Sequence, residues 1–314
     1  MALNYIELQF KNTLAGLKMA RFSSPASQAA SVMKEVQGNQ IRSVGTVRNY
    51  EGALTTVAEY VKAERICSNG LRELTPEQAI TYLEQRAESV SQSTLNMERQ
   101  AIQCMMQHVT DKLSPQQTIT VIKSELEQAL LSRAYTQEQI SVITDRMRDK
   151  NSIPTEICNK AGLRAHEIYT LRPTAEQAPD VRPEHPDKFR GREAISYTVT
   201  GKGGLTREVQ IPTELAERLE SYRLDTPERV TDRNINYDRA YDINGGQKLS
   251  SSFSSASNRV LGFSHGIHGL RHTYAQERLG ELMREIHLDY FNAREVISQE
   301  LGHFRPDITE VYLR

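Results

Sequence analysis

The sequence predicts a mainly α-helical chain with a small antiparallel β-sheet. Several stretches before residue 150 repeat apolar residues every three or four positions, which is the period of an amphipathic helix. Residues 194–212 alternate apolar and polar residues on both sides of a Gly-Lys-Gly-Gly turn, the pattern of a β-hairpin. The 314 residues, 38% of them hydrophobic and 25% charged, are enough for two domains with ordinary cores.

The N-terminal part predicts helices joined by short polar connections. Apolar positions from Leu3 to Leu17 indicate a helix within the first 20 residues. Further helical stretches follow between Thr46 and Met106, and Thr75 before Pro76 is a typical helix start. We therefore expect an N-terminal helical extension over residues 1–40 and a helical domain over residues 41–130.

A second domain is predicted for residues 131–314. Thr136 with Gln139 fits a capping box that begins a helix, and apolar spacing predicts another helix over residues 161–173. Four prolines within residues 173–191 predict a loop. Beyond residue 212 we expect helices, interrupted by a Ser-rich loop around residues 250–257.

Charge and cysteine usage exclude few classes of function. The net charge is −1, so the overall charge gives no indication of a polyanionic partner. Cys67, Cys104 and Cys158 follow no metal-binding spacing and predict reduced thiols of a cytosolic protein. The N-terminus lacks the pattern of a signal peptide and any apolar run of membrane length, so we expect no export and no membrane insertion.

A histidine-rich motif near residue 270 carries candidate chemistry. His268 and Arg271 are spaced i, i+3 in HGLRHTYA, which places them on one face of a predicted helix, although a solvated helix end is the alternative. A zinc site built from His265, His268 and His272 is a further alternative, but no cysteine or carboxylate completes the ligand set.

Other polar residues are weak signals when taken singly. Arg164 and Glu167 have the same i, i+3 spacing, and an ordinary surface ion pair is the alternative. Lys202 lies in a glycine-rich turn, and an ordinary solvated hairpin tip could have the same sequence. Tyr312 lies nine positions after His303, near a chain end that would normally fray.

Taken in order, these motifs resemble the tyrosine recombinase family of phage and mobile-element integrases. GLRAHE is similar to the first box of the family, GKGG to its lysine turn, and HGLRHTYA to its H-x-L-R-H-T-x-A box. LGHFRPDITEVY keeps the family interval from histidine to tyrosine. The resemblance implies a SAM-like core-binding domain before residue 130 and an α+β catalytic domain after it. The catalytic residues it implies are Arg164, Lys202, His268, Arg271, His303 and Tyr312, with Glu167 and His272 in supporting positions.

The resemblance implies a site-specific DNA recombinase or integrase. Tyr312 would attack a backbone phosphorus and form a 3′-phosphotyrosine. Arg164 and Arg271 would stabilise the charge that develops on the phosphate oxygens. Lys202 would protonate the leaving 5′-oxygen, while either histidine of the set could accept the phenol proton. Because the phosphotyrosine stores the bond energy, we expect no metal, ATP or other cofactor.

Double-stranded DNA is the partner that the resemblance implies. The two domains would clamp the duplex, and free monomers or weak oligomers would assemble into a homotetramer on it, with an accessory DNA-bending or directionality protein as a further partner. Arg42, Arg48 and Arg99 are candidate phosphate contacts, with solvated charges as the alternative. We expect a cytoplasmic protein, either bacterial and nucleoid-associated or encoded by a phage or mobile element.

The segment after the tyrosine departs from the family pattern. Family members usually continue with a segment that docks on a neighbouring subunit, whereas only Leu313 and Arg314 follow here. We therefore expect the helix at residues 3–17 to supply contact between subunits. Two other functions stay open, a type IB topoisomerase and an inactive DNA-binding regulator, although the separate helical domain and the intact residue set favour recombination.

Overall fold

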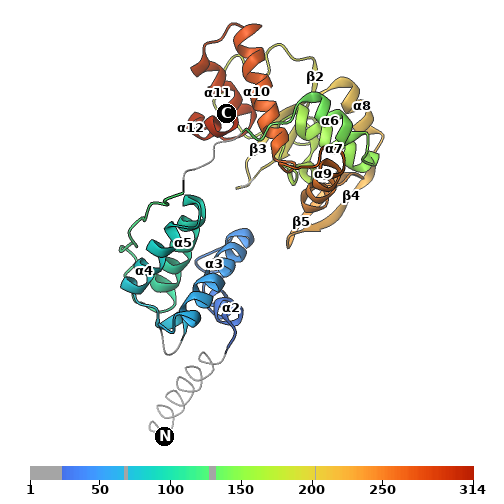
Figure 1. The fold of residues 1–314 in the computed structure, drawn as a ribbon. Helices are drawn as coiled ribbons and strands as arrows, with labels where there is room; N and C mark the ends of the chain where they lie inside the picture. Colours follow the sequence, from blue (N-terminus) through green and yellow to red (C-terminus); the bar gives the residue numbers. More distant parts are fainter. Residues whose placement is uncertain (1–22, 67–69, 127–131, 202) are drawn as a thin grey trace. The chain divides into compact units, whose positions relative to one another are not determined.

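The computed structural model describes residues 23–66, 70–126, 132–201 and 203–314. The chain divides into two compact units, Met1–Ala129 and Leu130–Arg314, and each has a hydrophobic core of its own. Helices predominate, and short antiparallel strands occur in the second unit (Figure 1). This confirms the predicted fold class. The helix expected at residues 3–17 lies outside the described residues.

The first unit is a bundle of helices around one core. Buried side chains such as Leu54, Tyr82 and Ile102 meet in this core. Residues 25–36, which the sequence assigns to the extension, pack in the same core, so the structure shows no division near residue 40. The elements are α2 (Pro25–Val36), α3 (Val44–Ala63), η1 (Leu71–Glu73), α4 (Pro76–Ala87) and α5 (Gln92–His108).

The second unit combines a small sheet with seven described helices. The strand order is β1 (Arg172–Pro173), β2 (Ala194–Thr200) and β3 (Thr206–Pro212), and β2 with β3 forms the hairpin that the sequence predicts. The main core lies between this sheet and the helices α6 to α9. The helices are α6 (Gln137–Thr144), α7 (Asp149–Lys160), α8 (Thr213–Glu220), α9 (Gly246–Leu261), α10 (Gly269–Arg284), α11 (Tyr290–Glu300) and α12 (Pro306–Thr309).

The prediction of a helix over residues 161–173 is wrong. The chain leaves α7 through Gly162, whose φ of +61° is a left-handed conformation that suits glycine. A Cβ atom there would lie 2.8 Å from the side chains of Leu301 and Tyr274. Only a 3₁₀ turn, η2 (Glu167–Thr170), follows before β1. Arg164 therefore lies in a tight turn and not on a helix face.

Two expectations beyond residue 212 are also wrong. Residues 223–241 form an antiparallel ribbon of β4 (Arg223–Asp232) and β5 (Ile235–Tyr241), because Arg233 and Asn234 both adopt positive φ and make a hairpin turn. The Ser-rich segment expected as a loop lies inside α9. Its apolar residues Leu249, Phe253 and Ala256 share the buried face, and this packing outweighs the weak helix propensity of serine.

Among the described residues, no helix combines the length and the apolar character needed to cross a lipid bilayer.

The capping box at the start of α4 should stabilise the first unit. Gln78 N donates to Thr75 Oγ1 at 3.3 Å, and Thr75 N donates to Gln78 Oε1 at 3.0 Å. Thr75→Ala removes the cap and should lower the free energy of unfolding by about 1 kcal/mol, measured by urea unfolding of the full chain. Thr81→Ala is the matched control, because Thr81 is exposed within the same helix and its hydroxyl donates to Glu77 O, away from the cap. Equal losses in the two variants would contradict this role.

Candidate active site

Tyr312 is held in place although it lies near the end of the chain. It ends the 3₁₀ turn η3 (Glu310–Tyr312), which directly follows α12. Its side chain packs in a small core with residues of α10 and α11, joined by Leu313, and Tyr312 is only 9% exposed. Its hydroxyl lies 3.1 Å from Nε2 of His268. Packing on two helices therefore orders the phenol.

Arg271 lies directly beneath this phenol. It occupies the first turn of α10 and is fully buried, and its guanidinium carbon is 5.6 Å from the centre of the Tyr312 ring. Its Nη atoms donate to the carbonyls of Gly162 and Leu301, whereas Nε has no partner among the described residues. Burial, followed by repulsion from Arg164, lowers the pKa of Arg271 to about 9, so the group stays charged at neutral pH.

Three histidine rings surround the tyrosine ring. The ring centres of His268, His272 and His303 lie 5.5, 4.7 and 5.1 Å from that of Tyr312. Burial and the nearby guanidinium groups lower their pKa values to about 4, about 4 and about 3. All three imidazoles are therefore neutral at pH 7.

The tautomer of His303 follows from its neighbours. Nη2 of Arg271 lies 3.0 Å from Nε2 of His303, and because arginine can only donate, this nitrogen must accept. The ring proton therefore resides on Nδ1, which faces Oγ1 of Thr309 at 3.1 Å. In this arrangement the accepting nitrogen of His303 is already occupied, whereas Nε2 of His268 faces the phenol.

Glu167 is fully buried and binds two arginines. Its carboxylate accepts from the backbone N of Arg164 at 2.8 Å and from Nη1 of Arg164 at 2.9 Å. Arg207 donates two parallel hydrogen bonds to the same carboxylate, both 2.9 Å long. Burial alone would raise the pKa of Glu167, but Arg207, Arg271 and Arg164 outweigh it and hold the pKa well below its usual range.

The remaining predicted residues fall into three groups. Lys202 lies outside the described residues. In the first unit, Arg42 and Arg48 are exposed, whereas Arg99 is partly buried and donates to the carbonyl of Ile119 at 3.1 Å, which ties it to its own unit. The described segments contain no cluster of three or more His, Cys, Asp or Glu side chains that could hold a metal ion. The zinc alternative therefore gains no support.

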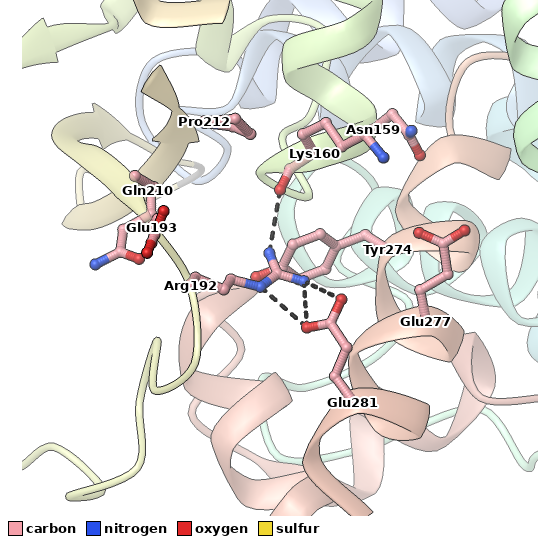
Figure 2. A pocket seen from close by; sticks show the side chains of 10 residues that line it. Asn159, Lys160, Arg192, Glu193, Gln210, Pro212, Tyr274, Glu277 and Glu281 are labelled. Atoms are coloured by element: carbon pink, nitrogen blue, oxygen red, sulfur yellow. Dashed lines mark hydrogen bonds and ion pairs between the residues drawn. The ribbon is translucent and has the colours of Figure 1, made fainter. Parts of the chain in front are cut away.

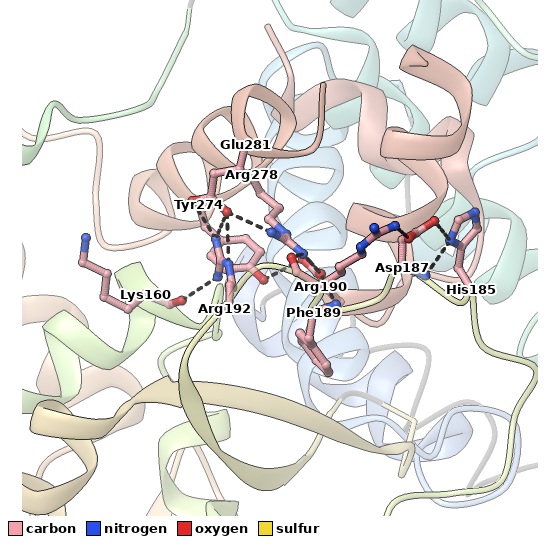
Figure 3. Close-up of polar contacts among 10 residues, drawn as sticks. Lys160, His185, Asp187, Phe189, Arg190, Arg192, Tyr274, Arg278 and Glu281 are labelled. Carbon is pink, nitrogen blue, oxygen red and sulfur yellow. Dashed lines mark hydrogen bonds and ion pairs between the residues drawn. The ribbon is translucent and has the colours of Figure 1, made fainter. Parts of the chain in front are cut away.

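Sequence reasoning missed Arg207 and a second buried charge cluster. Arg278 in α10 donates to the carboxylate of Glu300 at 3.0 and 3.1 Å, and Tyr274 donates to it at 2.8 Å. Figure 3 shows Arg278 reaching from α10 toward the backbone of Arg190, whose carbonyl accepts a 3.1 Å hydrogen bond. The cluster fixes the proline-containing loop and the C-terminal end of α11, which leads into His303.

A hollow of about 200 Å³ lies beside this cluster. Figure 2 shows Arg192 between the ring of Tyr274 and the carboxylate of Glu281, which it contacts at 3.0 Å. The hollow is lined by Asn159, Lys160, Arg192, Glu193, Ala194, Gln210, Pro212, Tyr274, Glu277 and Glu281. None of the five predicted catalytic residues that the structure describes lines it.

The structure thus brings together five of the six predicted catalytic residues, namely Arg164, His268, Arg271, His303 and Tyr312. The set contains a phenol, neutral imidazoles and guanidinium groups. Such a set can generate a nucleophile and stabilise a phosphate-like anion.

Solved structures of recombinases share this fold. The XerH site-specific recombinase bound to a palindromic difH substrate in a post-cleavage complex has a TM-score of 0.60 and 15% identity, covering 92% of this chain and 81% of that chain. A lambda integrase dimer bound to a COC′ core site has a TM-score of 0.57 and 13% identity, covering 96% and 81%. The Tn1549 transposon integrase with a circular intermediate DNA has a TM-score of 0.51 and 13% identity, covering 93% and 95%.

These likenesses show that the chain has the tyrosine recombinase fold. No family model matches the sequence, and no curated protein matches it.

The three histidines should titrate far below the usual range. Each pKa is depressed in the folded state, whereas the ordinary value is 6.5, so the unfolded chain binds more protons and folding stability falls as the pH drops from about 7 toward 3. Imidazole NMR of the full chain should place the midpoints of His268 and His272 at about 4 and that of His303 at about 3, with resonances assigned through His→Asn variants. Midpoints near 6.5 would contradict the buried, guanidinium-flanked site.

Proposed function

We propose that the chain is a tyrosine-type, site-specific DNA recombinase that cleaves and rejoins DNA strands through a 3′-phosphotyrosine. The contact between His268 and the hydroxyl of Tyr312, above the buried guanidinium of Arg271, carries this proposal. A neutral imidazole beside a phenol is the arrangement needed to generate a phenolate. The recombinase fold supports the same conclusion.

Tyr312 is the nucleophile of the proposed reaction. Its proton passes to Nε2 of His268, and the phenolate oxygen bonds to phosphorus as the P–O5′ bond breaks. The leaving 5′-oxygen takes a proton from a general acid, for which we propose Lys202. Rejoining reverses these transfers, so the number of phosphodiester bonds is conserved and neither ATP nor a metal ion is consumed.

Arg164 and Arg271 neutralise the phosphate. In the pentacovalent transition state, negative charge grows on the non-bridging oxygens, and planar guanidinium groups can donate to two of them at once. The unpartnered Nε of Arg271 is one available donor. Because Arg271 is fully buried, with the Tyr312 ring 5.6 Å from its guanidinium carbon, the packing around it must open before a phosphate can bind.

Double-stranded DNA is the proposed partner, and subunits assemble on it. The similar XerH, Tn1549 and lambda proteins were solved on DNA, and lambda integrase was also solved as a tetramer on a Holliday junction, with a TM-score of 0.56. By this analogy a tetramer exchanges strands. Arg42 and Arg48, which are exposed on the helical unit, are proposed phosphate contacts.

Tyr312→Phe should abolish covalent attachment to DNA. The probe is a nicked suicide duplex whose sequence is selected from a random pool by binding to the protein, and adducts are detected on denaturing gels. Adducts should form with wild type in EDTA and without ATP. Tyr222→Phe, which alters a tyrosine paired with Asp149, is the matched control and should react normally. An adduct that survives in Tyr312→Phe would exclude this nucleophile.

A second duplex in the same reaction separates recombination from simple relaxation. The wild-type adduct should join its strand to a second duplex that carries a free 5′-hydroxyl, since exchange between partners defines a recombinase. Efficient relaxation of supercoiled plasmid without joining would favour a topoisomerase. Binding without any adduct would favour an inactive regulator.

A further inference from the structure

Arg207 lies in the inward-facing row of β3. Side chains alternate along a strand, so Arg207 shares a face with Val209 and Ile211, which are fully buried. Arg207 itself is only 4% exposed, and its partner across the hairpin is the buried Val199. A buried guanidinium in an apolar row is costly unless it is paired and hydrogen-bonded.

All three nitrogens of this guanidinium have partners. Nη1 and Nη2 donate to the two carboxylate oxygens of Glu167 at 2.9 Å each, and Nε donates to the carbonyl of Glu300 at 3.2 Å. This fork geometry is specific to arginine, because the point charge of lysine cannot satisfy two oxygens in parallel. Arg207 therefore links the turn that carries Arg164 to the end of α11.

Two glycines show how tightly the neighbouring turns pack on this pair. Gly302, at φ +71°, precedes His303, and a Cβ atom there would lie 2.7 Å from Cδ of Arg207. Gly201 precedes Lys202 in the sequence, and a Cβ atom there would lie 3.1 Å from Oε1 of Glu167. The Arg207–Glu167 pair therefore packs closely against the chain at both Gly201 and Gly302.

We propose that Arg207 is a positioning residue, which holds and neutralises Glu167 so that the carboxylate engages the guanidinium of Arg164 through Nη1 alone. The rest of that guanidinium can then bind the phosphate, and the His303 turn stays in register. Arg207 is too buried to contact DNA itself. Without it, the carboxylate of Glu167 would have Arg164 as its main partner and would draw that charge away from the phosphate. The inference rests on the proposed strand-cleavage function.

Single-turnover cleavage of the selected suicide duplex at saturating protein tests this role. Arg207→Met should slow adduct formation about 100-fold, the scale expected when a catalytic group is misplaced by about 1 Å, while DNA affinity stays close to wild type. The double variant Glu167→Gln with Arg207→Met should cleave faster than Arg207→Met alone, because the uncompensated carboxylate is gone. Arg218→Met is the matched control, since Arg218 makes a similar two-bond pair with Glu156 at an exposed site.

Cleavage by Arg207→Met at the wild-type rate would overturn the inference, as would a double variant no faster than the single one. If circular dichroism shows that Arg207→Met does not fold, Arg207→Lys decides: slower cleavage at unchanged affinity supports the role, and a wild-type rate overturns it. If the wild-type protein forms no adduct, the proposed function fails and this inference falls with it. If the wild-type protein cleaves normally and Arg207→Met is unaffected, the inference is wrong while the proposed function stands.

Discussion

An excess of positive charge in a largely buried cluster is the constraint on which the site depends. The Arg164 side chain is 25% exposed, whereas Arg271 and the Arg207–Glu167 pair are buried. Arg164, Arg207 and Arg271 contribute three positive charges and Glu167 contributes one negative charge, so these four residues carry a net charge of +2. Burying charge without a counter-ion is costly, and the lowered pKa of Arg271 is one expression of that cost. A DNA phosphate would supply the missing negative charge, and a transition state that is more negative would gain most.

The proposed nucleophile, Tyr312, is packed closely against this charge. The Tyr312 ring covers Arg271, and its turn is held by the core of α10 and α11. Arg271 is fully buried in this arrangement, so in the proposed reaction the packing around it must open before a phosphate can bind. The neutral His268 keeps the phenol hydrogen-bonded until then.

The sequence predicted the fold class and the hairpin, because helical period and strand alternation are local signals. The grouping of Arg164, His268, Arg271, His303 and Tyr312 was implied by the family resemblance of their motifs. Sequence reasoning missed the ribbon at residues 223–241 and the turn at Arg164, where left-handed residues and tertiary contacts decide. Arg207 and Glu300 were missed for another reason. Arg207 lies on the buried face of β3 together with Val209, and Glu300 lies on the buried face of α11 together with Ile297. A charged residue at an apolar position of the repeat was therefore the signal that could have revealed these buried charges. The partners, Glu167 for Arg207 and Arg278 for Glu300, are too distant in sequence for residue spacing to reveal the pairs.

The most direct test is a structure of Tyr312→Phe bound to its selected duplex. The account predicts one backbone phosphate within hydrogen-bonding distance of both Arg164 and Arg271, with residue 312 displaced from above Arg271 and Glu167 still paired with Arg207. A duplex whose phosphates all lie away from the two guanidinium groups, with Arg271 still sealed against the carbonyls of Gly162 and Leu301, would contradict it.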